Sequence, residues 1–183
     1  MIQRITDGLG RLVTVNEQDI STGQLTQATS YSYNYLDQLT DVDQGGQYRK
    51  YKYDAIGRLL FEKIPEQSAT INDGTGVYWT SKYTYTTFDA VYQKTDARGV
   101  VSTFTYDGLN RVTQVSYNTV SGVTTAPTVS YVYDYDSTYG TTADGMLLRV
   151  NVGTDYKERY TFDSSYRVAS AIRTIGSRTY TTS

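Results

Sequence analysis

Short stretches in which aromatic or aliphatic residues alternate with polar ones recur along the chain, each interrupted by Asp and Gly. The clearest is Tyr51–Pro65, with the sequence YKYDAIGRLLFEKIP. Its first residues alternate between tyrosine and lysine, which is the period-two pattern of a half-buried strand. Asp54 and Gly57 then take the first and fourth positions of a turn, as is typical of a type I turn closed by a G1 bulge. This stretch is therefore predicted to be a β-hairpin.

The predicted turn also sets which residues lie opposite each other in the hairpin. The expected pairs are Asp54–Arg58, Tyr53–Leu59 and Tyr51–Phe61. In this register the aromatic and apolar side chains share one face and the charged ones share the other, with Leu60 as the exception. The pattern and the turn residues thus indicate the same local structure, which is the consistency expected of a stable element.

The same hairpin recurs six more times, and internal repetition of this kind decides the architecture. The further copies begin at Ile5, Tyr31, Thr86, Phe104, Tyr131 and Arg159, and Arg178–Ser183 resembles the first strand of an eighth. The residues that carry the repeat motif are Asp7, Gly10, Arg11, Tyr51, Tyr53, Asp54, Gly57, Arg58, Tyr106, Asp107, Asn110, Arg111, Tyr131, Tyr133, Asp134, Phe162, Asp163 and Arg167.

Several copies depart from the motif. We name three turn positions after Asp54, Gly57 and Arg58: the Asp, Gly and Arg positions. In the second copy these positions are assigned to Asn34, Asp37 and Gln38, and in the fourth copy to Asp89, Tyr92 and Gln93. In the sixth copy the insertion YDSTYGTTADG separates Asp134 from the return strand Met146–Val152.

These hairpins predict an all-β protein. No helical period persists, and the spacing between copies varies from 18 to 35 residues, which a solenoid of identical coils would not allow. Consecutive antiparallel hairpins tolerate such variation, because loops of any length can join neighbouring strands. Polar segments such as Pro65–Ser81 are expected to be surface loops. We expect about 15 strands, and so large an open sheet has to twist and curve. Residues 1–183 are expected to be a single domain and a fragment of a longer protein.

Composition excludes several classes of function. The net charge is −2 without a run of Lys or Arg, so a nucleic-acid partner is not expected. No apolar stretch is long enough to span a membrane, and the N-terminal sequence does not resemble a signal peptide. The chain has no His and no Cys, so triads that use them, imidazole–metal sites and disulfides cannot form. No cofactor and no metal is expected.

The repeated hairpin resembles the YD repeats of the RHS family, whose signature is Tyr-x-Tyr-Asp-x-x-Gly-Arg-Leu. YKYDAIGRL (Tyr51–Leu59) matches every defined position, FTYDGLNRV (Phe104–Val112) matches with conservative changes, and DGLGRL (Asp7–Leu12) matches the second half. The linking sequence Thr95–Val112 also resembles the Asp-x-x-Gly spacer of the family. Because the motif recurs, the resemblance covers nearly the whole chain.

The resemblance implies a long strip of β-sheet that forms a hollow shell, as in bacterial polymorphic toxins, insecticidal toxin complex C components and teneurins. It also implies further repeats and a C-terminal toxin or effector domain as partners, and secretion or a place on the bacterial cell surface. Closed shells of the family have several times as many repeats. The Asp-Pro motifs of its self-cleaving boundary are missing, because Pro65 follows Ile64 and Pro127 follows Ala126. No protease activity and no cargo domain is therefore assigned to this chain.

Carboxylates are the remaining candidates for chemistry. Asp41 with Asp43, and Asp134 with Asp136, would lie in pairs on one face of a strand, as the two acids of a glycosidase could. The same pairs, or the segment Asn72–Gly76, could bind Ca²⁺, although neither fits a twelve-residue calcium loop. We favour turn acids and an Asx-type turn instead. The chain is not expected to be an enzyme.

Aromatic and basic residues suggest two binding hypotheses. Exposed rings can stack on sugars, and Tyr78 and Trp79 are the best candidates for such a platform, so a carbohydrate-binding surface module is the alternative function. The tyrosines of the hairpins more simply pack across strands. The arginines of the repeat, Arg11, Arg58, Arg111 and Arg167, are expected to pair with Asp across the turn or to stack on a neighbouring Tyr, rather than to bind anions. Exposed strand edges predict self-association.

Overall fold

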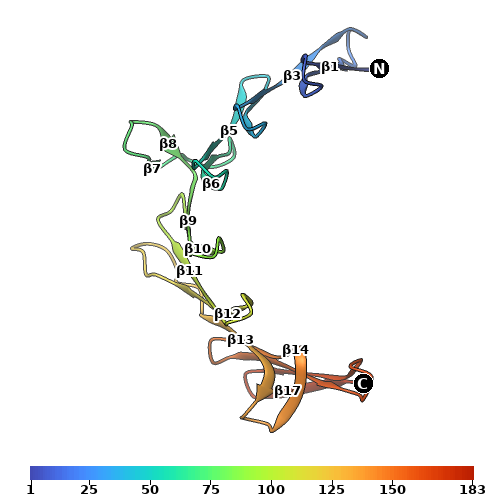
Figure 1. Ribbon diagram of the computed structural model, residues 1–183, viewed down its shortest axis with the longest axis vertical. Coiled ribbons are helices and arrows are strands. Elements are labelled where there is room, and N and C mark those ends of the chain that lie inside the picture. Colours follow the sequence, from blue (N-terminus) through green and yellow to red (C-terminus); the bar gives the residue numbers. More distant parts are fainter. The chain divides into compact units, whose positions relative to one another are not determined.

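The computed structural model describes residues 1–183 and consists of strands and turns without a helix (Figure 1). The strands are β1 (Ile2–Thr6), β2 (Leu12–Gln18), β3 (Leu25–Tyr33), β4 (Leu39–Gln44), β5 (Gln47–Tyr53), β6 (Leu59–Lys63), β7 (Ile71–Asn72), β8 (Tyr78–Trp79), β9 (Ser81–Tyr85), β10 (Val91–Asp96), β11 (Val101–Tyr106), β12 (Val112–Tyr117), β13 (Val129–Asp136), β14 (Thr141–Val152), β15 (Tyr156–Phe162), β16 (Val168–Ile175) and β17 (Arg178–Thr182). The predicted all-β class is confirmed. No helix is present that could span a membrane.

Consecutive strands pair with one another in a 15-stranded antiparallel sheet that is not closed into a barrel. Its order follows the chain, except that β6 pairs with β9 and the strands between them, β7 and β8, form a separate two-stranded hairpin. The prediction of consecutive hairpins is therefore confirmed.

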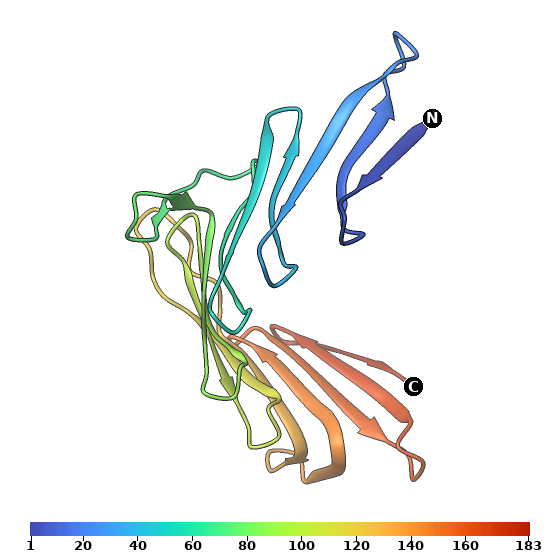
Figure 2. The ribbon, with the colours of Figure 1, turned by 45° about the horizontal axis from the view of Figure 1, so that its top comes forward.

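The chain divides into two compact units. Unit 1 comprises Met1–Thr84 and Lys94–Gly99, and unit 2 comprises Tyr85–Gln93 and Val100–Ser183. Within unit 1, the turns that join β1 to β2, β3 to β4 and β5 to β6 lie at one edge, and the β2–β3 and β4–β5 turns lie at the opposite edge (Figure 2). The single domain expected over residues 1–183 stays a prediction.

Six hairpins share one turn geometry. The amide of the residue at the Asp position donates to the carbonyl of the residue at the Arg position, with N···O distances of 2.8–3.0 Å. The amide at the Gly position donates back to the carbonyl at the Asp position, at 3.0–3.2 Å. The Gly position is always left-handed, with φ between 59° and 92°, which explains Gly10 and Gly57 there and Asn110 in the fifth hairpin.

A second irregularity, in the return strand, occurs in the first, second, third, fifth, sixth and seventh hairpins and corrects the predicted register. Tyr53 lies opposite Leu59 as expected, but Tyr51 lies opposite Glu62, and Phe61 lies opposite Lys52. The predicted Tyr51–Phe61 pair is wrong because Leu60 is an extra residue in the return strand, a β-bulge that shifts the pairing by one. The equivalent extra residues in other hairpins are Val13, Thr40, Thr113, Leu148 and Ala169.

The fourth hairpin was assigned incorrectly from the sequence. Its turn begins at Thr86, whose amide donates to the carbonyl of Ala90, and Asp89 has the left-handed backbone of the Gly position. Tyr92 and Gln93 lie in β10 and not in the turn. The hydroxyl of Thr86 accepts the amide of Ala90 at 3.1 Å and so replaces the usual Asp carboxylate, which is why the sequence motif misled.

The sixth hairpin is longer than the others. Its insertion does not separate the strands, because Asp134, Tyr135 and Asp136 continue to pair with β14. Asp134 therefore lies inside β13 and does not begin a turn, contrary to the prediction. The turn instead follows Asp136, whose carbonyl accepts the amide of Tyr139 at 3.2 Å.

Few side chains are buried. Most of these lie beside the β7–β8 hairpin or in the extended β13–β14 hairpin. In unit 2, Leu148 and Asp136 have 0% exposure and belong to the extended β13–β14 hairpin. In unit 1, Trp79, Thr80 and Phe61 are buried where the β7–β8 hairpin meets β6. The expectation of a surface loop over Pro65–Ser81 is thus wrong for its last residues. Elsewhere the strand residues are mostly half-buried, as in a sheet without a second layer.

Candidate functional site

The candidate functional site consists of two kinds of contact. Some close a hairpin turn, and others join one turn to the next hairpin. In the first turn, Asp7 Oδ1 accepts the amides of Leu9 and Arg11 at 2.9 and 3.0 Å. Asp7 Oδ2 accepts Arg11 Nε at 2.7 Å. The Nε–Oδ2 bond recurs at 2.7–2.8 Å in three more turns, formed by Asp54–Arg58, Asp107–Arg111 and Asp163–Arg167.

These hydrogen bonds favour the charged form of each carboxylate. The side chain of Arg11 lowers the pKa of Asp7, and the backbone amide of Arg111 lowers the pKa of Asp107. Asp163 behaves in the same way, since the backbone amide of Arg167 lowers its pKa. The turns therefore keep their ion pairs at neutral and mildly acidic pH.

Arg111 also contacts the next hairpin. Its Nη1 and Nη2 donate to Asp134 Oδ1 and Oδ2 at 3.0 and 2.5 Å, and its guanidinium lies 4.4 Å from the ring centroid of Tyr133. The hydrogen bond from Arg111, followed by the amide of Gly145, lowers the pKa of Asp134 to about 2. The same ion pair raises the pKa of Arg111. One side chain thus closes its own turn and binds its neighbour.

Arg11 makes the corresponding contacts in unit 1. Its Nη1 donates to Asp37 Oδ1 at 2.7 Å, and its guanidinium lies 5.1 Å from the ring centroid of Tyr33. The Tyr33 hydroxyl donates to the carbonyl of Leu12 at 2.8 Å. The sequence predicts that the repeat arginines pair with Asp across the turn or stack on a neighbouring Tyr, and at Arg11 and Arg111 both contacts occur together.

The hydrogen bond from a tyrosine hydroxyl to the preceding hairpin also occurs where that hairpin has no arginine at the Arg position. Tyr53 donates to the carbonyl of Leu39 at 2.9 Å, and Tyr106 donates to the carbonyl of Val91 at 2.6 Å. In the first of these joints Gln38 stands at the Arg position, and its Nε2 donates to the carbonyl of Gly57 at 2.6 Å. We use the term hairpin joint for the contacts between one hairpin and the next that are made by the residue at the Arg position and by the tyrosine hydroxyl. Sequence reasoning missed it, although the preference for Tyr over Phe before the turn was a signal.

Tyr131, Tyr133 and Phe162 lie in strands as expected, opposite aliphatic residues, whereas Tyr51 lies opposite Glu62. Tyr133 pairs with Leu147, Tyr131 with Val150, and Phe162 with Val168. These positions contribute cross-strand packing, the role that was favoured for the tyrosine stripe.

The proposed aromatic platform is not formed. Tyr78 is half exposed, but Trp79 is only 6% exposed, and its ring centroid lies 5.6 Å from that of Phe61. Trp79 is therefore part of the small core beneath the β7–β8 hairpin. The prediction that it is an exposed platform for sugars is wrong, because the segment folds back on the sheet.

The segment Asn72–Gly76 is a turn held by its own side chains. Asn72 Oδ1 accepts the amide of Gly74 at 2.7 Å, and Asp73 Oδ1 accepts the amide of Thr75 at 3.0 Å. Asp73 Oδ2 forms an ion pair with Lys52 Nζ at 2.7 Å, which is the main cause of its lowered pKa. No group of three or more acidic residues forms a metal site in the chain.

The two carboxylate pairs are also engaged in local contacts. Asp41 forms an ion pair with Lys50 at 3.2 Å, and Asp43 accepts the amide of Gly46 at 2.9 Å. Asp136 is held by Arg149 Nε and Nη2 at 2.7 and 3.1 Å. These acids connect strands and turns, and they do not converge on a cleft as the acids of a glycosidase would.

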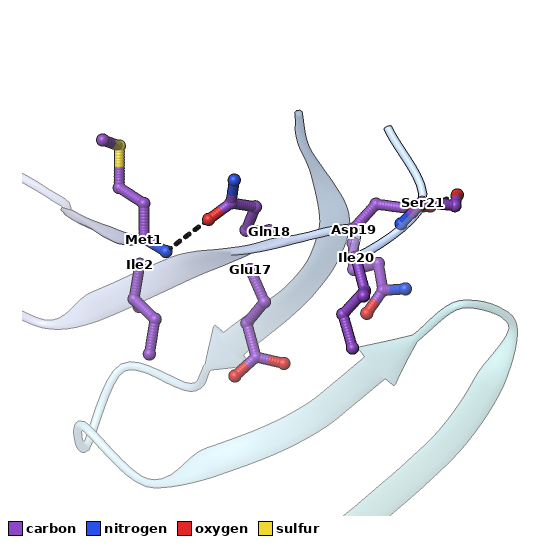
Figure 3. Close-up of a pocket in the computed structure, with 8 residues that line it drawn as sticks. Met1, Ile2, Glu17, Gln18, Asp19, Ile20 and Ser21 are labelled. Atoms are coloured by element: carbon purple, nitrogen blue, oxygen red, sulfur yellow. Dashed lines mark hydrogen bonds between the residues drawn. The ribbon is translucent and has the colours of Figure 1, made fainter. Parts of the chain in front are cut away.

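An open hollow in unit 1 lies beside β1 and β2 and is lined by Met1, Ile2, Glu17, Gln18, Asp19, Ile20, Ser21 and Gln27 (Figure 3). Met1 N donates to Gln18 Oε1 at 2.7 Å, and Asp19 accepts the amide and hydroxyl of Ser21. These side chains do not form a nucleophile with a base, so the hollow carries no candidate chemistry.

The fold is shared with chains of solved toxin complexes. The structure of TcdB2-TccC3-Cdc42 superposes with a TM-score of 0.68 at 16% sequence identity and covers 98% of this chain. The structure of TcdB2-TccC3 without its hypervariable C-terminal region gives a TM-score of 0.66 at 17% identity over 94% of this chain. This chain has the fold of part of a TcdB2-TccC3 chain.

The match covers a small part of those larger proteins. The chain spans 9% of the length of the TcdB2-TccC3 chains, and 8% of the corresponding chain in the Photorhabdus luminescens Tc holotoxin pore, which gives a TM-score of 0.62 at 14% identity over 89% of this chain. No protein-family model matches the chain, and no curated protein does. The TcdB2-TccC3 fold is therefore recognised in this chain by structure and not by overall sequence identity.

Proposed function

We propose that this chain is a structural YD-repeat segment of a bacterial RHS-type protein. It contributes wall to a β-sheet shell or surface scaffold that encloses or displays a toxin-type cargo. Further repeats and a C-terminal toxin or effector domain of the parent protein are its partners, and the parent protein is secreted or held at the cell surface. The chain itself performs no catalysis.

The observation that carries this proposal is the match to the TcdB2-TccC3 chain over 98% of the present chain. The repeat signature at Tyr51–Leu59 supports it independently, because it is a feature of the sequence and not of the fold. The buried and ion-paired acids add further support, since each one connects parts of the scaffold.

The hairpin joint provides the mechanism of such a scaffold. A single-layer sheet gains little from a buried core, so the free energy of folding has to come from strand pairing and from contacts between neighbouring hairpins. Arg11 and Arg111 each tie one turn to the next, and Tyr33, Tyr53 and Tyr106 add a hydroxyl bond. Each joint needs residues of only two neighbouring hairpins. A sheet built from such joints can therefore be extended by any number of hairpins.

Protease protection in the full-length gene product tests the proposal. We expect the segment that follows the repeats to resist protease at neutral pH and to be digested once the repeats are unfolded. Arg111→Ala should speed this digestion more than Arg167→Ala, because Arg111 binds the neighbouring hairpin and Arg167 is 80% exposed beside its own turn. Digestion of the following segment at the same rate with and without the repeats would overturn the proposal.

A further inference from the structure

The insertion in the sixth hairpin gathers three cations around one tyrosine ring. It places Tyr139 in the turn between β13 and β14, where the side chain is 40% exposed. The distances to its ring centroid are 4.0 Å from Arg159 Cζ, 5.6 Å from Lys157 Nζ and 5.8 Å from Arg149 Cζ. One cation over a tyrosine ring is a stabilising contact, but three cations around the same ring also repel one another. The scaffold function does not require this accumulation of positive charge.

Strand pairing brings two of these cations directly opposite each other. Arg149 of β14 pairs with Arg159 of β15, and Lys157 lies two residues before Arg159 on the same face. Like charges opposite each other destabilise a sheet. The Asp136 carboxylate compensates only Arg149, whose Nε and Nη2 it binds at 2.7 and 3.1 Å. Arg159 forms no hydrogen bond or ion pair with the chain, and Lys157 donates only to Tyr139 Oη at 3.2 Å.

No other carboxylate forms an ion pair with Arg159 or Lys157. Glu158, between them in the sequence, lies on the opposite face and pairs with Arg173 at 2.8 Å. Asp155 is exposed in the β14–β15 turn and forms no ion pair. The residues of β16 and β17 that continue the face of Arg159 are uncharged: Ile172, Thr174, Thr179 and Thr181. Two positive charges therefore remain on this face.

The donors of these side chains are available to an anion. A guanidinium has five N–H donors in a planar fork, and none of those of Arg159 binds the chain. The ammonium of Lys157 uses one of its three donors on Tyr139 Oη, which leaves two. Because that oxygen accepts from Lys157, its own O–H can donate to a ligand. Arg159 and Lys157 are half-buried, so their charges are partly shielded from water and still reachable.

We propose that Arg159, Lys157 and Tyr139 bind a phosphate group. Two uncompensated positive charges match a phosphate dianion better than a carboxylate, which carries one negative charge. A terminal phosphate group also has three strong acceptor oxygens, which suit three separate donor groups. Arg149 lies outside the contact because Asp136 already occupies it. This phosphate site goes beyond the scaffold function and does not depend on it.

Inorganic phosphate tests the site directly. Titrated into the isotope-labelled chain at constant ionic strength, it should shift the NMR signals of the Arg159 and Lys157 side chains and reach saturation. Arg159→Gln should raise the dissociation constant at least about tenfold, because it removes a charge-assisted contact. The matched control is Arg178→Gln, which removes the same charge from an exposed arginine on the opposite face. It should leave the dissociation constant unchanged.

A second variant and a second anion sharpen the test. Lys157→Gln keeps Arg159 over the Tyr139 ring and should also weaken phosphate binding, so the test stands if Arg159→Gln loses its strands in the spectrum. Acetate, a monoanion, should bind at least about tenfold more weakly than phosphate. Equal effects of Lys157→Gln and Arg178→Gln, titration without saturation, or equal affinity for acetate and phosphate would each overturn the proposal.

Two further ligands distinguish the source of the phosphate group. Glycerol phosphate presents it in solution, and vesicles that contain phosphatidic acid present it on a membrane surface. Binding of glycerol phosphate alone identifies a soluble ligand, whereas cosedimentation with the vesicles that is lost in Lys157→Gln identifies a lipid headgroup. Binding to neither would overturn the proposal. Protease protection by the scaffold is measured separately, so failure of the phosphate site leaves that function standing.

Discussion

Arg111 binds both carboxylate oxygens of Asp134, at 3.0 and 2.5 Å, although the two residues belong to different hairpins. The same guanidinium also closes its own turn, because its Nε donates to Asp107 Oδ2 at 2.7 Å. The ion pair therefore fixes the position of one hairpin turn relative to the next.

The first prediction concerns the stability of that joint. Replacement of Arg111 by Ala should lower the melting temperature more than replacement of Arg167 by Ala. Both variants lose an ion pair with an Asp in their own turn, but only Arg111 also holds Asp134 and lies over Tyr133. Thermal unfolding followed by circular dichroism measures the difference. Equal melting temperatures for the two variants would contradict the role of the joint.

The second prediction concerns pH. The pKa of Asp134 is lowered from 3.8 to about 2, so the folded chain binds its proton less readily than the unfolded chain does. The stabilisation is therefore complete above about pH 4 and is lost as the pH falls through about 2. In Arg111→Ala the pKa of Asp134 should move back toward 3.8 and the acid transition should shift to higher pH. Carboxyl NMR titration measures the pKa, and an unchanged value would refute the assignment.

The third prediction concerns the tyrosine hydroxyl. Tyr53→Phe removes the donor to the carbonyl of Leu39 and should lower the free energy of unfolding by about 1 kcal/mol. Tyr51→Phe is the control, because the Tyr51 hydroxyl has no hydrogen bond within the chain. Urea unfolding of the two variants gives the comparison. Equal effects of the two substitutions would contradict this role of the Tyr53 hydroxyl, because both variants keep the aromatic ring.

The fourth prediction concerns the turn backbone. Gly57 has φ of +92°, and a Cβ there would lie 2.9 Å from Gln38 Nε2, so Gly57→Ala should destabilise the chain by about 1 to 2 kcal/mol. Gly108 has no positive φ, and a Cβ there would meet no atom within 4 Å. Gly108→Ala should therefore be neutral or slightly stabilising. The free energy of unfolding of both variants tests this contrast.

The fifth prediction uses the single tryptophan as a reporter. Asp73→Ala removes the ion pair with Lys52 that holds the β7–β8 hairpin near the sheet, so Trp79 should become more exposed and its fluorescence should shift to longer wavelength. Glu66→Ala is the control, since Glu66 pairs with Arg49 and is 58% exposed. Emission spectra at neutral pH measure the shift, and identical spectra would count against this role of Asp73.

The repeating element and the positions of most of its copies follow from local sequence alone. Alternation around Tyr51 and Tyr53, with Asp54 and Gly57 in the turn, was enough to predict the hairpin, because turn geometry is a local property of a few residues. Prediction from the motif failed at Thr86, where a hydroxyl replaces the carboxylate in the turn. It also failed at Tyr51 and Phe61, because the extra residue Leu60 leaves the hydrophobic pattern almost unchanged.

The contacts between neighbouring hairpins, in contrast, are seen only in the folded chain. Burial of Trp79 on Phe61, the ion pair of Arg111 with Asp134 and the bond from Tyr53 to Leu39 all join residues that are 14 to 23 positions apart. Contacts of this kind depend on how neighbouring hairpins are placed in the sheet, and no local pattern specifies that placement. The repeat thus encodes its own folding unit, while the joints arise only when several units pair side by side.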